Sequence, residues 1–558
     1  MTSSALLTDL ANRLFDHLME SDPLGATLMG DRSYDRELAH LNRDSEEKFV
    51  ATREAIRRDA LALNQDELTT QEKLTLQVII SQTQCMDYMF HADAATYTVS
   101  AFPVAPASVL LAFLRMVGVT SAEQAQDYLE RLGQIPRYLD QATDELERGR
   151  ALGRMPIKSL VSGAIDQLNK FLENPVESLT PTVAGDWLGQ EEFQDRVHAL
   201  AHGLVSTAFR TYRDVLISDV LPTARDDNKV GLVHLDGGLE IYQGLIKAHT
   251  TTELTAEHLH QRGLDLVKHI HEDFAELGQR VLGTSEVSEI FKRMATDANL
   301  RWETSEQMLE AVTDVVRRAE SVAPEWFGKV PSVECAISAI PEVEAEGSGM
   351  AYYMPAAMDG SRAGTYYQNV SHPTERRVYD LESVAFHEAV PGHHFQLQLA
   401  LEMSDLPNIR RMTLFNAYAE GWGLYSERLA FEMGLYSSDT QLLGMLAADV
   451  WRASRLVVDT GMHAFGWSRQ QAIDFMVTHT PASLEEITSE VNRYIAMPGQ
   501  ALSYMTGRLE IERLRATLNE KLASDFDVKR FHDEVLGSGA LPLDVLARHL
   551  ESVFAANT

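Results

Sequence analysis

The chain has 558 residues, 45% of them hydrophobic and 23% charged, the balance of a globular protein with ample material for a core. Its 82 aspartates and glutamates outnumber its 49 lysines and arginines and leave a formal net charge of -33. Because so acidic a surface repels phosphate backbones and anionic lipid headgroups, we expect neither nucleic acid nor a membrane as a partner.

Only two cysteines occur, Cys85 and Cys335, too few for a disulfide framework or a thiolate metal site. No stretch approaches the roughly 18 apolar residues of a membrane span. We therefore expect a cytoplasmic protein. The composition does not indicate an oligomeric state.

The amino-terminal segment has no basic region and predicts a helix rather than a signal peptide. Its leucines recur at helical spacing, at Leu6, Leu7, Leu10, Leu14 and Leu18. Helical periodicity continues to about residue 320, with turn-forming residues gathered at 22–24, 174–185 and 223–231. This pattern predicts an N-terminal helical lobe over residues 1–322.

The composition changes near Pro324. Three short segments rich in aromatic and β-branched residues follow, at 333–340, 349–354 and 364–370, and they predict a small sheet. Helical periodicity resumes near Asp380 and predicts a second lobe over residues 323–558. Since no linker separates the lobes, we expect a mainly α fold built as one continuous body.

The residues Phe-His-Glu-Ala-Val-Pro-Gly-His-His at 386–394 carry the clearest chemical signal. Zinc hydrolase helices read His-Glu-x-x-His, because histidines four apart share one helical face. Here Pro391 stands four residues after His387, and the motif returns if Pro391 and Gly392 are read as an insertion. A proline lacks the N–H that a helix needs, so a local bulge would bring His393 back beside His387.

His394 is the alternative second ligand. In an unbroken helix it would share a face with His387 but lie about 10.5 Å further along the axis, a long span for two ligands of one ion. We favour His393 as the ligand and His394 as a second-layer or substrate contact, and the choice stays open at this point.

A catalytic zinc site needs a third protein ligand, and the segment 416–427 offers one in Glu420. Glu427 lies seven residues on, near the same helical face, where it could orient a ligating histidine. Glu388 would be the general base, taking a proton from metal-bound water and passing it to the leaving group.

Further polar residues follow in two later stretches. Between residues 493 and 504 we expect oxyanion donors at Tyr494 and Tyr504, with Arg493 and Gln500 as candidate substrate contacts. A helical stripe with a spacing of four predicts a buried polar network, either behind the metal or facing substrate, formed by Arg455, Asp459 and His463.

Three phrases, HEAVPGHH, EGWGLYSE and RYIAMPGQALSY, resemble the signature of a widespread bacterial family catalogued as a domain of unknown function. A more distant likeness is to the helical glutamate-ligand zinc peptidases, such as thimet oligopeptidase, angiotensin-converting enzyme and the Taq-type carboxypeptidase. That likeness implies two lobes around a deep channel, one zinc ion held by His387, His393 and Glu420, and Glu388 as base. It also implies a candidate edge strand for the peptide main chain at 364–370. Within this segment we expect Tyr366 to lie behind the metal ligands or to contact substrate.

The leading hypothesis is therefore a zinc metallopeptidase that cleaves short peptides. An amidase or esterase acting on a small metabolite would use the same residues and stays open. A third possibility is a non-catalytic helical binding protein, which would have no need of Glu388 and Glu420. The sequence indicates neither endo- nor exopeptidase action, nor side-chain specificity.

Overall fold

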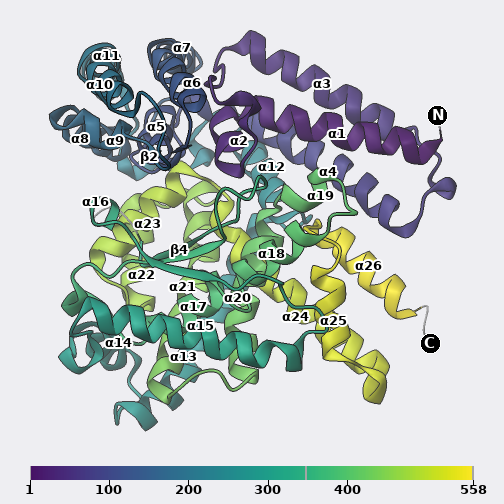
Figure 1. The fold of residues 1–558 in the computed structure, drawn as a ribbon. Coiled ribbons are helices and arrows are strands. Elements are labelled where there is room, and N and C mark those ends of the chain that lie inside the picture. The colour runs from purple at the N-terminus through teal and green to yellow at the C-terminus, as the bar shows by residue number, and fades with distance from the viewer. Residues whose placement is uncertain (1, 346–348, 556–558) are drawn as a thin grey trace.

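The computed structural model describes residues 2–345 and 349–555, and it is mainly helical, as the sequence predicts (Figure 1). The helices before the small sheet are α1 (Ser3–Ser21), α2 (Pro23–Met29), α3 (Arg43–Leu61), α4 (Thr70–Ala92), α5 (Pro106–Phe113), α6 (Ala122–Gly133), α7 (Ile135–Ala151), α8 (Lys158–Glu173), α9 (Pro175–Leu179), α10 (Gln190–Leu200), α11 (Ser206–Val215), α12 (Gly238–Thr250), α13 (Ala256–Val281), α14 (Val287–Thr296) and α15 (Ser305–Trp326).

The helices in and after the sheet region are α16 (Glu342–Ala345), α17 (Asp380–Glu388), α18 (His393–Glu402), α19 (Asn408–Met412), α20 (Asn416–Glu432), α21 (Asp439–His463), α22 (Arg469–His479), α23 (Leu484–Ala496), α24 (Ser503–Leu522), α25 (Val528–Leu536) and α26 (Leu543–Ala555). Among the described residues, no helix is long and apolar enough to cross a membrane.

The first helix forms for local reasons that the sequence already contains. Thr2 caps α1 by accepting a hydrogen bond from the N–H of Ala5, and the helix ends where Asp22 caps α2 in turn. Of the predicted leucine stripe, Leu7, Leu10 and Leu14 are buried, while Leu6 faces outward. The prediction of a first structural helix is confirmed.

The predicted small sheet is present and has three strands, β3 (Ala336–Ala339), β4 (Ala351–Met354) and β5 (Thr365–Gln368). Their order is β3-β5-β4, with β5 parallel to β3 and antiparallel to β4. The edge strand predicted at 364–370 is therefore wrong, because β5 is bonded on both sides. The sequence also gave no sign of a two-stranded parallel pair, β1 (Gly118–Val119) with β2 (Thr182–Val183).

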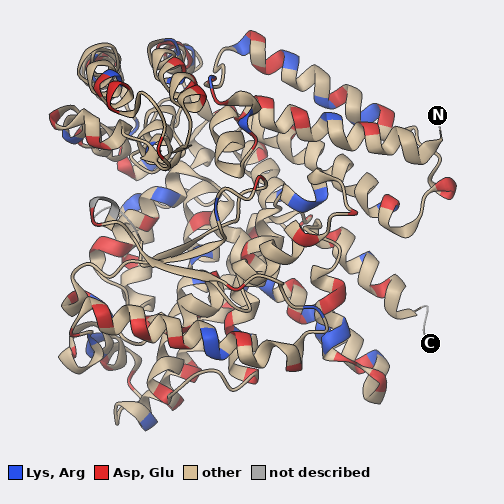
Figure 2. Cartoon of the chain, in the orientation of Figure 1, with Lys and Arg blue, Asp and Glu red and all other residues tan. Residues whose placement is uncertain are grey.

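One hydrophobic core joins the beginning of the chain to its end. Leu10 of α1, Val312 of α15, Phe386 of α17, Trp422 of α20 and Leu546 of α26 belong to the same buried cluster. Residues on both sides of the predicted lobe boundary at 322/323 thus share this core, and both ends of the chain lie at the right in Figure 1. Acidic residues are spread over the early and late helices alike (Figure 2).

Candidate metal centre

The chain stops being helical between the two motif histidines. Helix α17 ends at Glu388, the peptide bond from Val390 to Pro391 is cis, and α18 begins at His393. Helix α20 holds the connection, because the Pro391 carbonyl accepts hydrogen bonds from Trp422 Nε1 at 2.8 Å and Ser426 Oγ at 3.2 Å. Instead of one bulged helix, two short helices bring the motif together.

Position 392 requires glycine because of a close approach. A Cβ at Gly392 would lie 1.9 Å from the carbonyl oxygen of His387, which no side-chain-bearing residue could tolerate. With that approach made, the imidazole rings of His387 and His393 lie 4.8 Å apart between centroids, at 85° to each other. The Pro391-Gly392 pair thus places His393 beside His387.

Glu420 completes a convergent set of donor atoms. Its Oε2 lies 3.5 Å from Nε2 of His387 and 3.5 Å from Nε2 of His393. Two ligand atoms of a tetrahedral zinc site are about 3.4 Å apart, so this spacing suits such an ion. Although burial disfavours the charge of Glu420, bonds to His387 and His393 hold its pKa well below the usual range. Glu388 belongs to the same compact group of potential ligands as both histidines.

Glu427 fixes the orientation of His387. It is fully buried, and its Oε1 accepts a hydrogen bond from Nδ1 of His387 at 2.9 Å, which leaves Nε2 as the ring nitrogen that faces Glu420. Ser383 donates to the other oxygen of Glu427, and Nη2 of Arg452 lies 3.7 Å from Oε1. Burial disfavours the charged form of His387, but Glu420 and Glu427 outweigh it and raise its pKa to about 9.

Helix α20 approaches this ring closely. A Cβ at Gly423 would lie 2.7 Å from Cε1 of His387 and 2.8 Å from its Nε2, so a glycine here leaves the space that the ring occupies. Cationic charge is stabilised in this pocket, because three carboxylates, those of Glu388, Glu420 and Glu427, surround two imidazoles. Two imidazoles and a carboxylate are the donors that zinc prefers, so the residues fit that ion.

His394 points away from this set. The hydroxyl of Tyr353 lies 3.0 Å from its Nδ1, and the carbonyl oxygen of Val333 lies 3.1 Å from its Nε2, so both ring nitrogens have protein partners. The side chain is 1% exposed. His394 therefore ties α18 to the sheet region, and the geometry favours His393 as the histidine that faces His387 and Glu420.

Tyr353 is a residue that the sequence analysis missed. Besides its contact with His394, its backbone N–H donates to Oε2 of Glu388 at 3.0 Å. The hydrogen bond from Asn369 to Met350 marks those residues as a bonded pair, so the N–H groups of Ala351 and Tyr353 face outward from β4. Strand β4 thus presents its free edge to Glu388, and no side-chain pattern could have revealed this backbone contact.

A cavity of about 520 Å³ includes that edge in its lining. Ala351 and Glu388 line it together with Arg455 and Glu490. Glu388 thus lines a cavity, which is compatible with the deep channel that the peptidase resemblance implies.

Three of the predicted residues from the later stretches, Arg455, Arg493 and Tyr494, form a network around Glu490, which was not predicted. Glu490 accepts hydrogen bonds from Arg455 and from the Tyr494 hydroxyl, each at 2.8 Å, and from Arg493 at 2.9 Å. Although burial disfavours its charge, Arg493 and Arg455 hold the pKa of Glu490 well below the usual range. The Tyr494 hydroxyl donates its hydrogen within this network. Glu490 stands four residues before Tyr494, and this helical spacing is the signal in the sequence that could have identified Glu490.

Tyr504 is the predicted tyrosine that lies close to His387, one of the candidate metal ligands. Its ring lies 6.4 Å from the ring of His387 at an interplanar angle of 22°, and the Arg455 guanidinium carbon lies 4.4 Å from its centroid. Burial and the Glu420 carboxylate raise the pKa of Tyr504, so its hydroxyl keeps its proton. Arg493 binds Gln500 at 2.7 Å and thereby fixes the turn that leads to this tyrosine.

Tyr366, predicted as a substrate contact, is fully buried in the central strand β5, and its hydroxyl donates to Gln368 at 2.5 Å. Tyr366 therefore does not lie on an edge strand, because β5 is the central strand and β4 is the edge that faces Glu388.

Asp459 and His463 lie in a separate buried cluster. Asp459 accepts hydrogen bonds from the Tyr242 hydroxyl at 2.5 Å and the Gly499 N–H at 3.0 Å. Nδ1 of His463 accepts from the Leu232 N–H at 3.3 Å, and its Nε2 donates to the Tyr494 carbonyl at 3.0 Å. Together they join α21 to α12 and to the turn before Tyr504.

We predict that Asp459 makes the protein less stable as pH rises. Burial raises its pKa to about 7, so between about pH 4 and pH 7 the folded chain keeps a proton that the unfolded chain releases. Stability falls across that window, by up to about 4 kcal/mol. Asp459→Asn keeps an acceptor oxygen and cannot ionise. Its thermal midpoint should therefore rise relative to the parent between pH 5 and pH 8, whereas exposed Asp474→Asn should give no such trend.

The whole fold is similar to two solved structures. The crystal structure of the "putative lipoprotein from Colwellia psychrerythraea" matches with a TM-score of 0.90 and 26% identity, and covers 100% of both chains. A "putative lipoprotein of unknown function from Shewanella oneidensis" matches with a TM-score of 0.71 and 18% identity, over 97% of this chain and 99% of that one. No curated protein matches the sequence. The model of a family described as bacterial proteins of unknown function, DUF885, matches residues 23–550, and the chain belongs to that family.

Proposed function

We propose that the protein is a zinc-dependent hydrolase, and specifically a metallopeptidase that cleaves short peptides. One observation carries the proposal: Nε2 of His387 and Nε2 of His393 both lie 3.5 Å from the same oxygen of Glu420, with Glu388 beside them. His387, His393 and Glu420 would hold one zinc ion, and Glu427 would keep His387 in the tautomer that binds it. The ion would supply Lewis acidity toward a carbonyl group.

Glu388 would move the proton in this reaction. The Tyr353 N–H holds its Oε2 at 3.0 Å, which fixes the carboxylate without using Oε1. Oε1 would take the proton from the attacking water and deliver it to the leaving nitrogen. Tyr504, beside His387, would donate its hydroxyl hydrogen to the carbonyl oxygen as negative charge builds there.

The free edge of β4 would hold the peptide main chain. The backbone N–H of Ala351 faces outward from the edge of the sheet, and Ala351 lines the same cavity as Glu388. An extended peptide that pairs with this strand would lie along the cavity, with its carbonyl groups directed past Glu388. The preference for a peptide over another amide or an ester rests on this edge, since the other substrates have no main chain to pair.

The test combines metal analysis with digestion of a library of short peptides, followed by mass spectrometry. We expect about one zinc per chain, cleavage of peptides, and loss of cleavage in a chelator with recovery on added zinc. If the protein binds zinc but cleaves only esters or non-peptide amides, it is a zinc hydrolase of another kind and not a peptidase. Purified protein that takes up no supplied zinc would reject it and favour a binding protein.

We place this activity in the cytoplasm. Both cysteines are free, Cys335 in the core and Cys85 half-buried, which suits a reducing compartment. The two similar structures are named lipoproteins, so cell fractionation is the decisive measurement. The chain in the cytosolic fraction is the expected result, and its recovery with membranes would overturn the placement.

A further inference from the structure

A second cavity lies at the amino-terminal end of α20, the helix that carries Glu420. Its volume is about 390 Å³. Residues of α3 and α4 line it, together with Ala248 of α12 and residues 414–416, where α20 begins. It has no lining residue in common with the cavity that Glu388 lines. The candidate metal centre therefore has a second cavity close to one of its ligands.

The face of α20 that carries Glu420 also reaches this cavity. Asn416 lines the cavity and stands four residues before Glu420, so the two side chains share a helical face and lie about 6 Å apart along the axis. Both residues are partly exposed, whereas residues 417–419 between them are buried. The exposed face of this first turn thus connects the cavity with the candidate metal ligands.

The same turn is bonded to the segment that carries Tyr504. Nδ2 of Asn416 donates to Nδ1 of His249 at 2.7 Å, and the carbonyl oxygen of His249 accepts from Oγ of Ser503 at 3.1 Å. Burial lowers the pKa of His249 to about 4, so the ring is neutral and its Nδ1 can accept this bond. The wall of the cavity and the tyrosine that would donate to the carbonyl oxygen therefore belong to one bonded structure.

The lining of this cavity suits an apolar group. Aromatic and aliphatic side chains form most of it, among them Leu41, Phe49, Met86, Met89, Phe90 and Phe415. Its charged residues have partners, because Arg53 lies 3.3 Å from Asp87 and Glu46 lies 3.7 Å from Arg43. An apolar cavity of about 150 Å³ holds a benzene ring, so this larger one has room for the side chain of phenylalanine or leucine.

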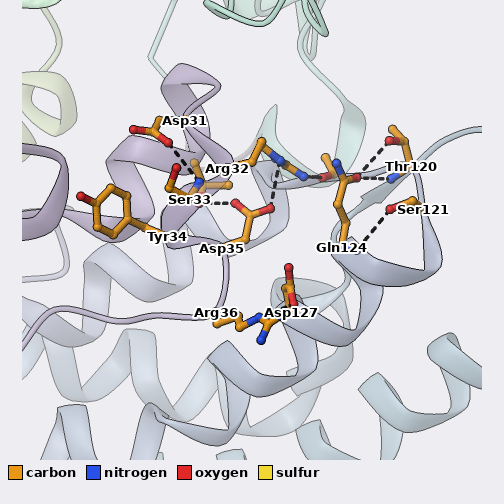
Figure 3. A network of polar contacts seen from close by, with 12 residues as sticks. Asp31, Arg32, Ser33, Tyr34, Asp35, Arg36, Thr120, Ser121, Gln124 and Asp127 are labelled. Atoms are coloured by element: carbon orange, nitrogen blue, oxygen red, sulfur yellow. Dashed lines mark hydrogen bonds and ion pairs between the residues drawn. The ribbon is translucent and has the colours of Figure 1, made fainter. Parts of the chain in front are cut away.

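One wall of the cavity is fixed before any ligand arrives. Residues 39–41 form part of it, and the N–H of Leu41 donates to Oε1 of Gln141 on α7 at 3.0 Å. Earlier in the same segment, Nε of Arg36 lies 2.7 Å from Oδ1 of Asp127 on α6 (Figure 3). A wall that is already in position lowers the entropy cost of binding.

We infer that this cavity takes an aromatic or long aliphatic side chain of the peptide substrate. The inference rests on the proposed peptidase function and names its side-chain preference. An extended peptide rises about 3.3 Å per residue, and the cavity begins about 6 Å from Glu420 along α20. The side chain in the cavity therefore belongs to a residue within about two positions of the bond that is cleaved.

The test compares peptides that carry alanine, phenylalanine, leucine or aspartate at one position, and this position is moved along the peptide. Mass spectrometry gives the bond that is cleaved, and initial rates give kcat/KM. At one position within about two residues of that bond, phenylalanine or leucine should raise kcat/KM about tenfold or more over alanine, because an apolar cavity discriminates by the apolar surface it buries. Aspartate should give no increase.

Two substitutions in the lining locate the preference. Cys85 is a half-buried residue of the cavity, so Cys85→Phe fills part of the space and should lower kcat/KM for the phenylalanine peptide about tenfold. Met89→Asp should have the same effect by placing a charge in the lining, at a residue that is 42% exposed and tolerates a polar side chain. Gln84→Phe is the control, since Gln84 is exposed and outside the lining, and it should keep the parent preference. Thermal midpoints show which variants are folded.

Three results would overturn the inference. Equal cleavage of the alanine, phenylalanine and leucine peptides at every position would reject it and leave the peptidase proposal standing. A preference for phenylalanine that both folded variants leave unchanged would place the side chain elsewhere on the molecule. A zinc-loaded protein that cleaves none of the peptides would overturn this inference and the peptidase proposal together.

Discussion

Replacing Glu388 by glutamine is expected to lower kcat for peptide cleavage by about 10²- to 10⁴-fold, the usual contribution of a general base. The amide oxygen of glutamine can still accept the Tyr353 N–H, so the side chain should stay in position. The amide cannot take a proton from water. The two histidines and Glu420 remain, so zinc content and KM should change little.

Glu402→Gln is the matched control. Glu402 ends α18, accepts hydrogen bonds from Ser332 and Gln398, and takes no part in the group around His387. Its variant should retain the parent kcat. Steady-state kinetics and metal analysis on the same samples separate the two effects. A Glu388→Gln protein within tenfold of the parent rate, with its zinc bound, would exclude Glu388 as the base.

The fold class and the family could be predicted from the sequence because their signals are local. Helical periodicity depends on neighbours three and four residues away, and turn residues mark where it ends. The proximity of His393 to His387 could also be predicted, from the interpretation of Pro391 and Gly392 as an insertion. A proline cannot donate the N–H bond of a helix, and a glycine tolerates backbone approaches that a Cβ would block. These facts return His393 to His387 without any tertiary information.

The arrangement of the sheet could not be predicted in this way. Three segments follow one another along the chain, but the last of them, β5, lies between the other two. Strand order depends on which faces are buried against α15 and α17, and short segments do not encode it. Two consequences followed: the edge strand was assigned to 364–370 instead of β4, and the bond from Tyr353 to Glu388 was missed.

Side-chain networks were predicted only in part, for a related reason. Helical spacing placed Arg455 on a buried face, but it gave no partner for that charge. The partner is Glu490 on α23, which lies beside α21 only because of tertiary packing. Glu427 was easier to identify, since its spacing from Glu420 puts both carboxylates on the face of α20 that meets His387.

The two adjacent histidines give the sharpest remaining test. His393→Gln should weaken zinc binding by more than about a hundredfold, because it removes a ligand. A residue that only hydrogen-bonds to a ligand contributes less to the affinity, typically about 10- to 100-fold. His394→Gln should bind zinc within about tenfold of the parent. It loses at least one of the bonds to Tyr353 and Val333, so a lower thermal midpoint is expected.

Competition with a zinc-binding dye measures both affinities, and the pair serves as its own control, since the substitutions are identical and one residue apart. The reverse pattern, with zinc lost in His394→Gln and kept in His393→Gln, would require α18 to rotate by about 100°, the angle between successive residues of a helix. Such a rotation would break the hydrogen bonds from Trp422 and Ser426 to Pro391. The connection between the helices therefore makes His393 the residue whose loss should empty the site.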